Sequence, residues 1–437
     1  MSFTMNRRNF VKTASAATLS ASMYSRVLGA NERLNVAVIG CGRMGQHNIS
    51  VQKGTGLVDV TAVCDVYESN LQEGMNLAGK AKAYRDFRPI LDDHSIDAVV
   101  IATPDHWHAL MTTLACEAGK DVFVEKPACT TLAEGRRMVQ IARRTGRIVQ
   151  VGTMQRSSPV FQNVVNIVQS GVLGKISIVR TWLVTNDYPN GIGSPEDSQP
   201  PANLDWDLWL GPAPERPFNW NRFGVGDRWS TFRYFWDYAG GMMTDWGVHL
   251  LDIVLWAMNE KAPSSISAVG GKFYLKDNRE TPDILHIAYQ FDKFVVTFSN
   301  QEANDRGIDG LGYGIEFYGS AASLFVDRGG YKIMPQEGGR FERSQMPNNL
   351  PLKYSSSDSG NDAHARNFID CIKSRKLPIS DIETGHRSTS ISILGNIAYR
   401  TGEKLIWDAE KEKTTNSESA NALLEPSYRA PWKLPSA

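Results

Sequence analysis

Short apolar runs alternate with amphipathic stretches through the first third of the chain. Continuous apolar runs predict buried strands at 36–39, 58–64, 97–103, 121–125 and 147–151. Helical periodicity predicts helices over 110–119 and 132–144, each followed or ended by a glycine. Strands that alternate with helices predict a parallel sheet with helices on both faces. We therefore assign residues 31–153 to a doubly wound α/β domain of the Rossmann type.

The pattern changes after Gly152. Helices are predicted at 159–170, 363–374 and 384–401. Strand-like segments are predicted at 176–184, 266–273, 284–290, 295–299, 314–318 and 322–326. Strands in succession favour antiparallel pairing. We expect residues 154–408 to form an α+β domain around a mostly antiparallel sheet, and the polar residues 409–437 to form a wrapping tail.

A long connection, 186–233, interrupts the second domain and is dense in proline, glycine, asparagine and tryptophan. Segments of this length without regular structure are usually functional or disordered. Its tryptophans are Trp206, Trp209, Trp220 and Trp229. Disordered segments are poor in aromatic residues, so we expect this connection to be ordered.

Composition places the chain among ordinary globular proteins. Of its 437 residues 42% are hydrophobic, and 47 basic side chains balance 47 acidic ones. This balance provides no field to attract nucleic acid or an anionic membrane, so neither is an expected partner. The five cysteines contain no C-x-x-C pair, which favours buried thiols over a metal site or a disulfide framework.

The first 30 residues carry a different signature. Arg7 and Arg8 precede a mildly apolar stretch rich in alanine, serine and threonine. This pattern resembles a twin-arginine export signal. The apolar stretch is too short and too interrupted to span a membrane. We therefore expect residues 1–30 to engage the twin-arginine export machinery and direct the protein to the periplasm or otherwise out of the cytoplasm. The alternative is a disordered basic tail.

The first predicted strand ends in the pattern G-x-G-x-x-G. Gly40 permits a tight turn, Gly42 lets the backbone approach a pyrophosphate, and Gly45 lets the next helix pack close to the sheet. Arg43 and Met44 lie in the same turn, at a helix N-terminus whose N–H groups attract phosphate. We assign all five residues to a dinucleotide site.

An acidic residue follows at the spacing that this site requires. Asp65 ends the second predicted strand, twenty residues after Gly45, where a carboxylate binds the ribose hydroxyls of an adenosine. The same carboxylate repels a 2′-phosphate. The pattern therefore predicts NAD as the cofactor, in preference to NADP.

Two more strand ends deliver polar groups to the same edge of the sheet. Thr103 ends the third predicted strand, and Pro104 and His108 follow it. Glu125 ends the fourth, and Lys126 follows it. Open parallel sheets bind ligands at the carboxyl ends of their strands. We therefore predict that these side chains lie beside the nicotinamide.

A second group of candidate catalytic residues, Asp245 and His249, lies in a predicted helix. Their spacing places both side chains on one helix face. Oxidation of an alcohol requires a base for the hydroxyl proton, and a histidine oriented by a carboxylate can serve. Lys126 is suited to stabilise the developing alkoxide. These three are the candidate catalytic residues; a helix cap and a core histidine are the structural alternative.

Five further residues are candidates for ligand binding. Gln155 follows the last strand of the first domain and is assigned to the cofactor, and its neighbour Arg156 to the substrate. Arg233 and Tyr234 precede the catalytic helix and are suited to bind hydroxyls. Trp209 offers an aromatic platform for the apolar face of a sugar ring, so we expect a carbohydrate substrate.

These motifs together resemble the glucose–fructose oxidoreductase and inositol dehydrogenase family, also called Gfo/Idh/MocA. The resemblance covers residues 34–408 and rests on the glycine turn, Thr103-Pro104 with His108, Glu125-Lys126-Pro127, and Asp245 with His249. It implies a second domain with a large open-faced sheet that commonly makes contacts between subunits, so a homo-oligomer is expected. It also implies an active site built from Lys126, Asp245 and His249. One departure is Asp105, where many relatives have asparagine.

The resemblance and the residues together imply an exported oxidoreductase. It transfers a hydride between a sugar or polyol and a tightly bound nicotinamide cofactor, without a metal. Two alternatives stay open: NAD-dependent cleavage of a glycoside through a keto-sugar, and a non-catalytic sugar sensor. The presence of all three candidate catalytic residues argues against the sensor.

Overall fold

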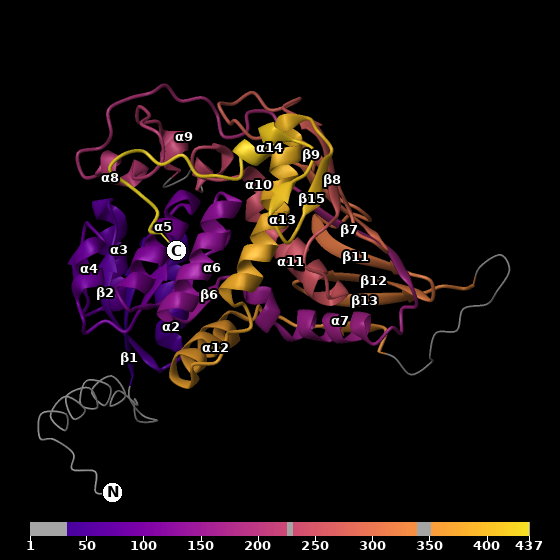
Figure 1. Ribbon diagram of the computed structural model, residues 1–437, viewed down its shortest axis with the longest axis horizontal. Helices are drawn as coiled ribbons and strands as arrows, with labels where there is room; N and C mark the ends of the chain where they lie inside the picture. The colour runs from indigo at the N-terminus through magenta and orange to yellow at the C-terminus, as the bar shows by residue number, and fades with distance from the viewer. Residues whose placement is uncertain (1–32, 225–229, 339–350, 437) are drawn as a thin grey trace, which may run out of the picture.

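A computed structural model describes residues 33–224, 230–338 and 351–436 (Figure 1). The expected export signal at 1–30 and Trp229 lie outside the described residues. None of the helices in the described part of the chain is long and apolar enough to cross a lipid bilayer. All five cysteines are buried and free, as the sequence predicts.

Six parallel strands form the first sheet, in the order β3-β2-β1-β4-β5-β6. The strands are β1 (Leu34–Ile39), β2 (Val58–Cys64), β3 (Lys82–Tyr84), β4 (Ala98–Ile101), β5 (Asp121–Val124) and β6 (Val149–Val151). The direction of the order reverses between β1 and β4. A crevice for a ligand is expected there, at the carboxyl ends of the strands. The predicted Rossmann-type sheet is confirmed.

Helices flank this sheet on both faces. They are α2 (Arg43–Gly54), α3 (Glu68–Ala78), α4 (Arg88–Asp92), α5 (His108–Glu117) and α6 (Leu132–Thr145). Helix α6 shows how the local sequence determines both ends of a helix. Thr131 and Glu134 form a reciprocal capping box, and Gly146 ends the helix in the left-handed conformation.

A ten-stranded sheet forms the second domain, in the order β14-β13-β12-β11-β7-β10-β9-β8-β15-β16. The strands are β7 (Ile176–Val184), β8 (Ser265–Gly271), β9 (Ile284–Gln290), β10 (Val295–Gln301), β11 (Tyr313–Gly319), β12 (Ala322–Asp327), β13 (Gly330–Pro335), β14 (Lys353–Ser355), β15 (Leu405–Asp408) and β16 (Lys413–Thr414). The pair β7 and β10 is parallel and the other pairs are antiparallel. The mostly antiparallel sheet is confirmed. The strands β13 to β16 were not predicted, because they are short or interrupted by proline and glycine.

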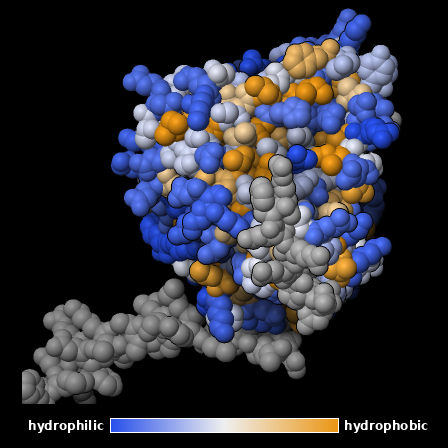
Figure 2. All heavy atoms as spheres, turned by 90° about the vertical axis from the view of Figure 1, so that its right-hand side faces the viewer, coloured by the Kyte–Doolittle hydropathy of each residue, from blue (hydrophilic) through white to orange (hydrophobic). Residues whose placement is uncertain are grey.

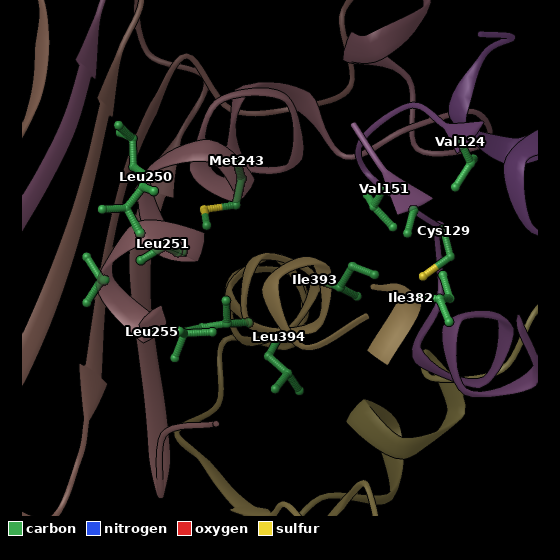
Figure 3. Packing of buried hydrophobic residues seen from close by; sticks show 14 of the residues in the cluster. Val124, Cys129, Val151, Met243, Leu250, Leu251, Leu255, Ile382, Ile393 and Leu394 are labelled. Carbon is green, nitrogen blue, oxygen red and sulfur yellow. The ribbon is translucent and has the colours of Figure 1, made fainter. Parts of the chain in front are cut away.

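Helices cover one face of this second sheet and connect it to the first domain (Figure 1). They are α7 (Pro159–Gln169), α10 (Gly241–Asp245), α11 (Gly247–Met258) and α13 (Ile382–Thr401). Helix α13 packs against both α11 and α6. In Figure 3, Leu255 points from α11 toward α13, and Ile393 points from the other side of α13 toward Val151 and Cys129 of the first domain. One continuous hydrophobic core therefore fixes the two domains relative to each other.

Helix α12 (Asn361–Ser374) departs from the domain division that the sequence suggests. It packs against α2, and Phe368 and Ile369 join the hydrophobic cluster around β1. The pattern of its apolar positions predicts a helix correctly. That pattern does not say which sheet the apolar face covers.

The connection 186–233 is ordered wherever it is described, around an aromatic cluster. Its helices α8 (Trp206–Leu210) and α9 (Trp220–Phe223) place Trp206 and Trp209 in a stack with ring centroids 4.6 Å apart. The C-terminal tail passes from α14 (Glu418–Ala422) onto the first domain (Figure 1). There Trp432 packs edge-on against Trp107, with ring centroids 4.9 Å apart.

Candidate active site

A cavity of about 780 Å³ lies where the carboxyl ends of the first sheet meet the second domain. Its volume is typical of a site for a cofactor and a small molecule. The predicted site residues that line it are Gly40, Gly42, Arg43, Met44, Asp65, Thr103, Pro104, His108, Glu125, Lys126, Trp209, Arg233, Asp245 and His249. Among the described residues, no group of three histidine, cysteine or acidic side chains is placed to hold a metal ion.

The glycine turn forms one end of this cavity. Gly40 has a φ of +89°, and a Cβ there would lie 2.6 Å from the Ala102 carbonyl oxygen. A Cβ on Gly45 would lie 1.8 Å from the Gly40 carbonyl oxygen. Gly45 itself does not line the cavity, so its contribution is close packing. Helix α2 begins at Arg43 without a side-chain cap, which leaves backbone N–H groups for a phosphate.

Asp65 supports the glycine turn from the end of β2. One carboxylate oxygen accepts a hydrogen bond from the Cys41 N–H at 2.7 Å, and the other accepts one from the Tyr67 N–H at 2.8 Å. Burial raises the pKa of Asp65 to about 6, so the group is mostly ionised at neutral pH. The turn, the uncapped helix and this carboxylate fit the diphosphate and ribose of a dinucleotide.

His108 links the two other strand ends. Its ring nitrogens lie 2.7 Å from the Pro127 carbonyl oxygen and 2.9 Å from the Thr103 carbonyl oxygen. Burial lowers the pKa of His108 to about 4, so the ring is neutral and donates to one of these carbonyls at a time. Glu125 accepts a hydrogen bond from Asn48 at 2.8 Å, and burial raises the pKa of its carboxyl. Both residues therefore position the turn that carries Lys126.

Lys126 and Asp245 meet across the two domains. The Lys126 ammonium donates to the Asp245 carboxylate at 2.5 Å and to the Asp245 carbonyl at 2.9 Å. Arg233, from the 3₁₀ helix η4 (Thr231–Tyr234), donates to the same carboxylate oxygen at 3.1 Å. Burial alone would raise the pKa of Asp245, but Arg233 and Lys126 outweigh burial and hold it well below its usual range. This aspartate is ionised and fixes both cations at the cavity wall.

The predicted pairing of Asp245 with His249 is wrong in its detail. The chain forms two short helices: α10 ends at Asp245, and α11 begins at Gly247. The Asp245 carboxylate is hydrogen-bonded to Lys126 and Arg233, and no hydrogen bond joins it to His249 among the described residues. Spacing along one helix predicted a shared face, but charges from elsewhere in the chain determine which way the carboxylate turns.

His249 lines the cavity as a neutral imidazole. Its Nδ1 is buried and makes no hydrogen bond within the described residues. Burial, and then the charges of Lys126 and Arg328, hold the pKa of His249 well below its usual value. An unprotonated imidazole at the cavity wall is the form of histidine that accepts a proton from a substrate hydroxyl.

Besides Gly45, three predicted binding residues do not line the cavity. Gln155 donates to the His249 carbonyl at 3.0 Å, so it supports the catalytic helix. Arg156 pairs with the buried Asp252, its Nε lying 2.9 Å from each carboxylate oxygen. Tyr234 is buried with the Arg279 guanidinium 4.3 Å from its ring centroid. Each is adjacent in sequence to a site residue or turn, but its side chain points into the protein.

Two residues of the site were not predicted from the sequence. Arg328, in the turn between β12 and β13, lines the cavity beside His249. A charged residue in a short turn is normally solvated, so no local signal identified it. Asp105 also lines the cavity, and burial raises its pKa to about 7 against the opposing effect of Arg233 and Lys126. Its departure from the family pattern was the available signal.

Asp105→Asn is expected to stabilise the protein more at pH 8 than at pH 5. The folded-state pKa of about 7 lies above the ordinary value of 3.8. The stability that this group contributes is therefore complete below pH 3.8 and lost as the pH rises through 7. The difference between these two pKa values corresponds to a loss of roughly 4 kcal/mol in the free energy of unfolding at high pH, at most. Urea unfolding at both pH values measures it. Asp245→Asn is the contrasting variant, because its lowered pKa predicts a loss of stability at pH 8; equal effects of Asp105→Asn at both pH values would contradict the prediction.

Family models match both domains. Residues 34–153 match the model described as "Oxidoreductase family, NAD-binding Rossmann fold", and residues 159–306 and 340–434 match "Oxidoreductase family, C-terminal alpha/beta domain". The chain belongs to the Gfo/Idh/MocA oxidoreductase family. The first of these models describes an NAD-binding domain, which confirms NAD as the predicted cofactor.

The individual relatives match only part of the chain, at about one third identity. The chain is 31% identical over 150 residues to inositol 2-dehydrogenase of Salmonella paratyphi B, and 32% identical over 145 residues to the NAD(+)-dependent scyllo-inositol 2-dehydrogenase of Bacillus subtilis. These matches cover 34% and 33% of this chain, and the chain spans less than half of each relative, 45% and 42%. The WlbA dehydrogenase from Bordetella pertussis, in complex with NADH and UDP-GlcNAcA, shares the fold with a TM-score of 0.64 at 19% identity, over 86% of this chain and 99% of that one.

Proposed function

We propose that this protein oxidises a hydroxyl group of a sugar or polyol with NAD. One observation carries the proposal: Lys126 from the first domain and His249 from the second line the same cavity, and Asp245 holds Lys126 in place at 2.5 Å. The glycine turn that binds a dinucleotide lines the same cavity. The names of the inositol dehydrogenases among its relatives support a polyhydroxylated substrate.

The residues of the site divide the chemistry between them. NAD supplies the hydride acceptor when it is bound. His249, which is neutral and lines the cavity, accepts the proton of the substrate hydroxyl. Lys126 donates a hydrogen bond to the oxygen on which negative charge develops. Asp245 and Arg233 fix the Lys126 ammonium, so little reorganisation is needed during the reaction.

The test is NAD reduction by the purified protein against a panel of aldoses, inositols and acyclic polyols. We expect an increase in absorbance at the wavelength of NADH with at least one of them, and a weaker response with NADP because Asp65 opposes a 2′-phosphate. Failure of the whole panel and of its oxidised counterparts would contradict the proposal. Cleavage of a glycoside without accumulation of NADH would favour the glycosidic alternative.

We also infer that NAD is tightly held and recycled within each subunit. An exported oxidoreductase works where free NAD is scarce, so a cofactor lost to exchange would not be replaced. Heat denaturation of the purified protein is expected to release close to one NAD(H) per chain. A protein that is purified empty and saturates only with added cofactor would contradict this inference.

The export itself is a separate proposal. Changing Arg7 and Arg8 together to lysine is expected to retain the protein in the cytoplasm, because the twin-arginine machinery recognises the arginine pair. Arg26→Lys, in the same segment, is the matched control and should be exported normally. Immunoblots of periplasmic and cytoplasmic fractions measure the outcome, and export of the double variant would contradict the proposal.

The outer face of the second sheet supports a homo-oligomer. Val269 on β8 is 71% exposed, and Phe273 and Tyr274 just beyond it are 67% and 60% exposed. Figure 2, which views the molecule from this side, shows hydrophobic residues spread among hydrophilic ones. Val269, Phe273 and Tyr274 are three large apolar side chains exposed in one short segment, and their exposure favours contact with a second copy. Light scattering after size exclusion would measure a multiple of the chain mass; a monomer at all concentrations would contradict this proposal.

A further inference from the structure

The wall of the cavity beside His249 holds more cations than the adjacent carboxylate can neutralise. Asp245 already accepts from Lys126 at 2.5 Å and from Arg233 at 3.1 Å. Arg328 is a third cation on the same wall, and its charge acts on His249. The electrostatic partners that act on Arg328 are Tyr313, which is a phenol, and Asp245. The only carboxylate that acts on Arg328, among the described residues, is therefore one that two nearer cations already share.

Arg328 is held in one orientation. Its Nε donates to the Gln155 side-chain oxygen at 3.1 Å, and its guanidinium carbon lies 4.7 Å from the centroid of the Trp246 ring. The Gln155 amide in turn donates to the His249 carbonyl at 3.0 Å. The two terminal nitrogens of Arg328 have no hydrogen-bonded partner in the described part of the chain. A fixed guanidinium with both terminal nitrogens free matches the geometry of a carboxylate.

A partly buried cation without a partner is costly, because burial removes hydration that no other charge replaces. Burial lowers the pKa of Arg328 from its ordinary value, although the group remains charged at neutral pH. The aromatic face of Trp246 offsets only part of this cost. A protein retains such a group most readily where a ligand supplies the missing anion.

We propose that the substrate is a sugar acid, and that Arg328 binds its carboxylate through both terminal nitrogens. The inference rests on the proposed function, since it names the substrate class of the same cavity. Arg328 is then a specificity-determining residue, placed by Gln155 and Trp246. A sugar of this class presents its hydroxyls to Lys126 and His249 while Arg328, on the same wall, fixes its carboxylate.

This arrangement also affects the base. Arg328 and Lys126 lower the pKa of His249, and Asp245 raises it. A carboxylate on Arg328 neutralises one of the two opposing charges, so the pKa of His249 rises when the substrate binds. An acidic substrate would therefore make His249 a stronger base at the moment of reaction. A neutral sugar would not.

The charges that line the cavity favour a carboxylate over a phosphate as the group that Arg328 binds. Glu125 is hydrogen-bonded to Asn48 and Asp105 lies near Arg233 and Lys126, and neither acts on Arg328. One cation is left without a partner, which suits a singly charged group. A phosphate monoester carries nearly two negative charges and would leave one of them unpaired.

The test compares each uronic acid with its parent aldose, and with the aldose 6-phosphate, on the full-length enzyme. We expect kcat/KM at least 30-fold higher for one uronate than for its parent sugar, and Arg328→Met to abolish that ratio mainly through KM. Arg328→Lys keeps the positive charge but lacks the paired terminal nitrogens of the guanidinium. This variant should retain part of the preference for the uronate. Arg180→Met is the matched control, because Arg180 also lies over an aromatic ring, Tyr318, but on the exposed face of the sheet. It should leave the ratio unchanged.

Calorimetry separates this inference from the proposed function. Binding of a uronate that Arg328→Met weakens at least 30-fold supports the sugar-acid assignment even if no turnover of any substrate is found. Equal or better turnover of neutral sugars would overturn the assignment while leaving the oxidoreductase intact. A preference for the aldose 6-phosphate would contradict the assignment of a carboxylate as the group that Arg328 binds. For the uronate, the pH profile of kcat should have its acidic limb at higher pH than for a neutral sugar.

Discussion

Replacing Lys126 with methionine is expected to lower kcat by about a thousandfold while the protein remains folded. The ammonium is the hydrogen-bond donor nearest to the developing alkoxide in the proposed reaction, and removal of one such donor usually costs about 10²- to 10³-fold. Asp245 keeps Arg233 as a partner at 3.1 Å, so the variant does not leave an isolated buried charge. Steady-state NAD reduction with the identified substrate measures the effect.

The control is Lys82→Met, which removes an exposed lysine paired with Asp93 at 3.4 Å in the same domain. It should retain full activity. NAD binding, followed by cofactor fluorescence, should differ little between Lys126→Met and the parent protein, because the dinucleotide is held mainly by the glycine turn and Asp65. Undiminished turnover by Lys126→Met would refute the catalytic assignment of this residue.

The site residues that were predicted most accurately from the sequence are those whose position is determined by the neighbouring backbone. The turn from Gly40 to Gly45 lies at the end of a strand and the start of a helix, and its spacing alone determines the close packing seen at both glycines. Lys126 follows a buried strand that fixes its direction. For the same reason most strands, and the helices α5, α6, α7, α12 and α13, were predicted within a few residues, since period and end signals are local properties.

The incorrect or missing predictions concern side chains whose direction depends on distant parts of the chain. Asp245 turns toward Lys126, 119 positions away in sequence, and not toward His249. Arg156 turns toward Asp252, 96 positions away. Arg328 reaches the cavity because β12 and β13 bring their turn beside Gln155, 173 positions away. One sequence contains no record of such contacts, because spacing identifies a shared face only within one helix or strand.

Helix α12 and the tail illustrate the same limit at the level of whole elements. The tail was expected to wrap the fold, but its anchors could not be named. The Tyr428 hydroxyl donates to Glu134 at 2.6 Å, and Arg429 donates to Asp207 at 2.6 Å. These contacts link the last residues to α6 and to the aromatic connection. They hold the turn of Asp105 to Trp107 from behind, through Trp432, so a segment far from the motifs supports the cavity.

Replacing His249 with alanine is expected to lower kcat about a thousandfold, with KM changed less than tenfold. A general base contributes roughly 10²- to 10⁴-fold, and the carboxylate nearest to His249 is engaged by Lys126 and Arg233, so it is a poor substitute. The side chain leaves a space open to the cavity, so added imidazole should restore part of the activity. His286→Ala, on the outer sheet face with its ring 2.9 Å from the Ser299 hydroxyl, is the matched control and should show neither loss nor rescue.

The pH dependence of the parent enzyme distinguishes His249 from Asp105 as the titrating group. Burial, Lys126 and Arg328 lower the pKa of His249, so a neutral substrate should be oxidised at full rate below pH 6.5, with an acidic limb only at lower pH. That limb should disappear in His249→Ala, while the residual rate becomes proportional to unprotonated imidazole in rescue experiments. A limb near pH 7 that Asp105→Asn removes would instead identify Asp105 as the group whose ionisation is required, because its pKa is raised to about 7. A limb that survives both substitutions would assign the proton to neither residue and would contradict the proposed mechanism.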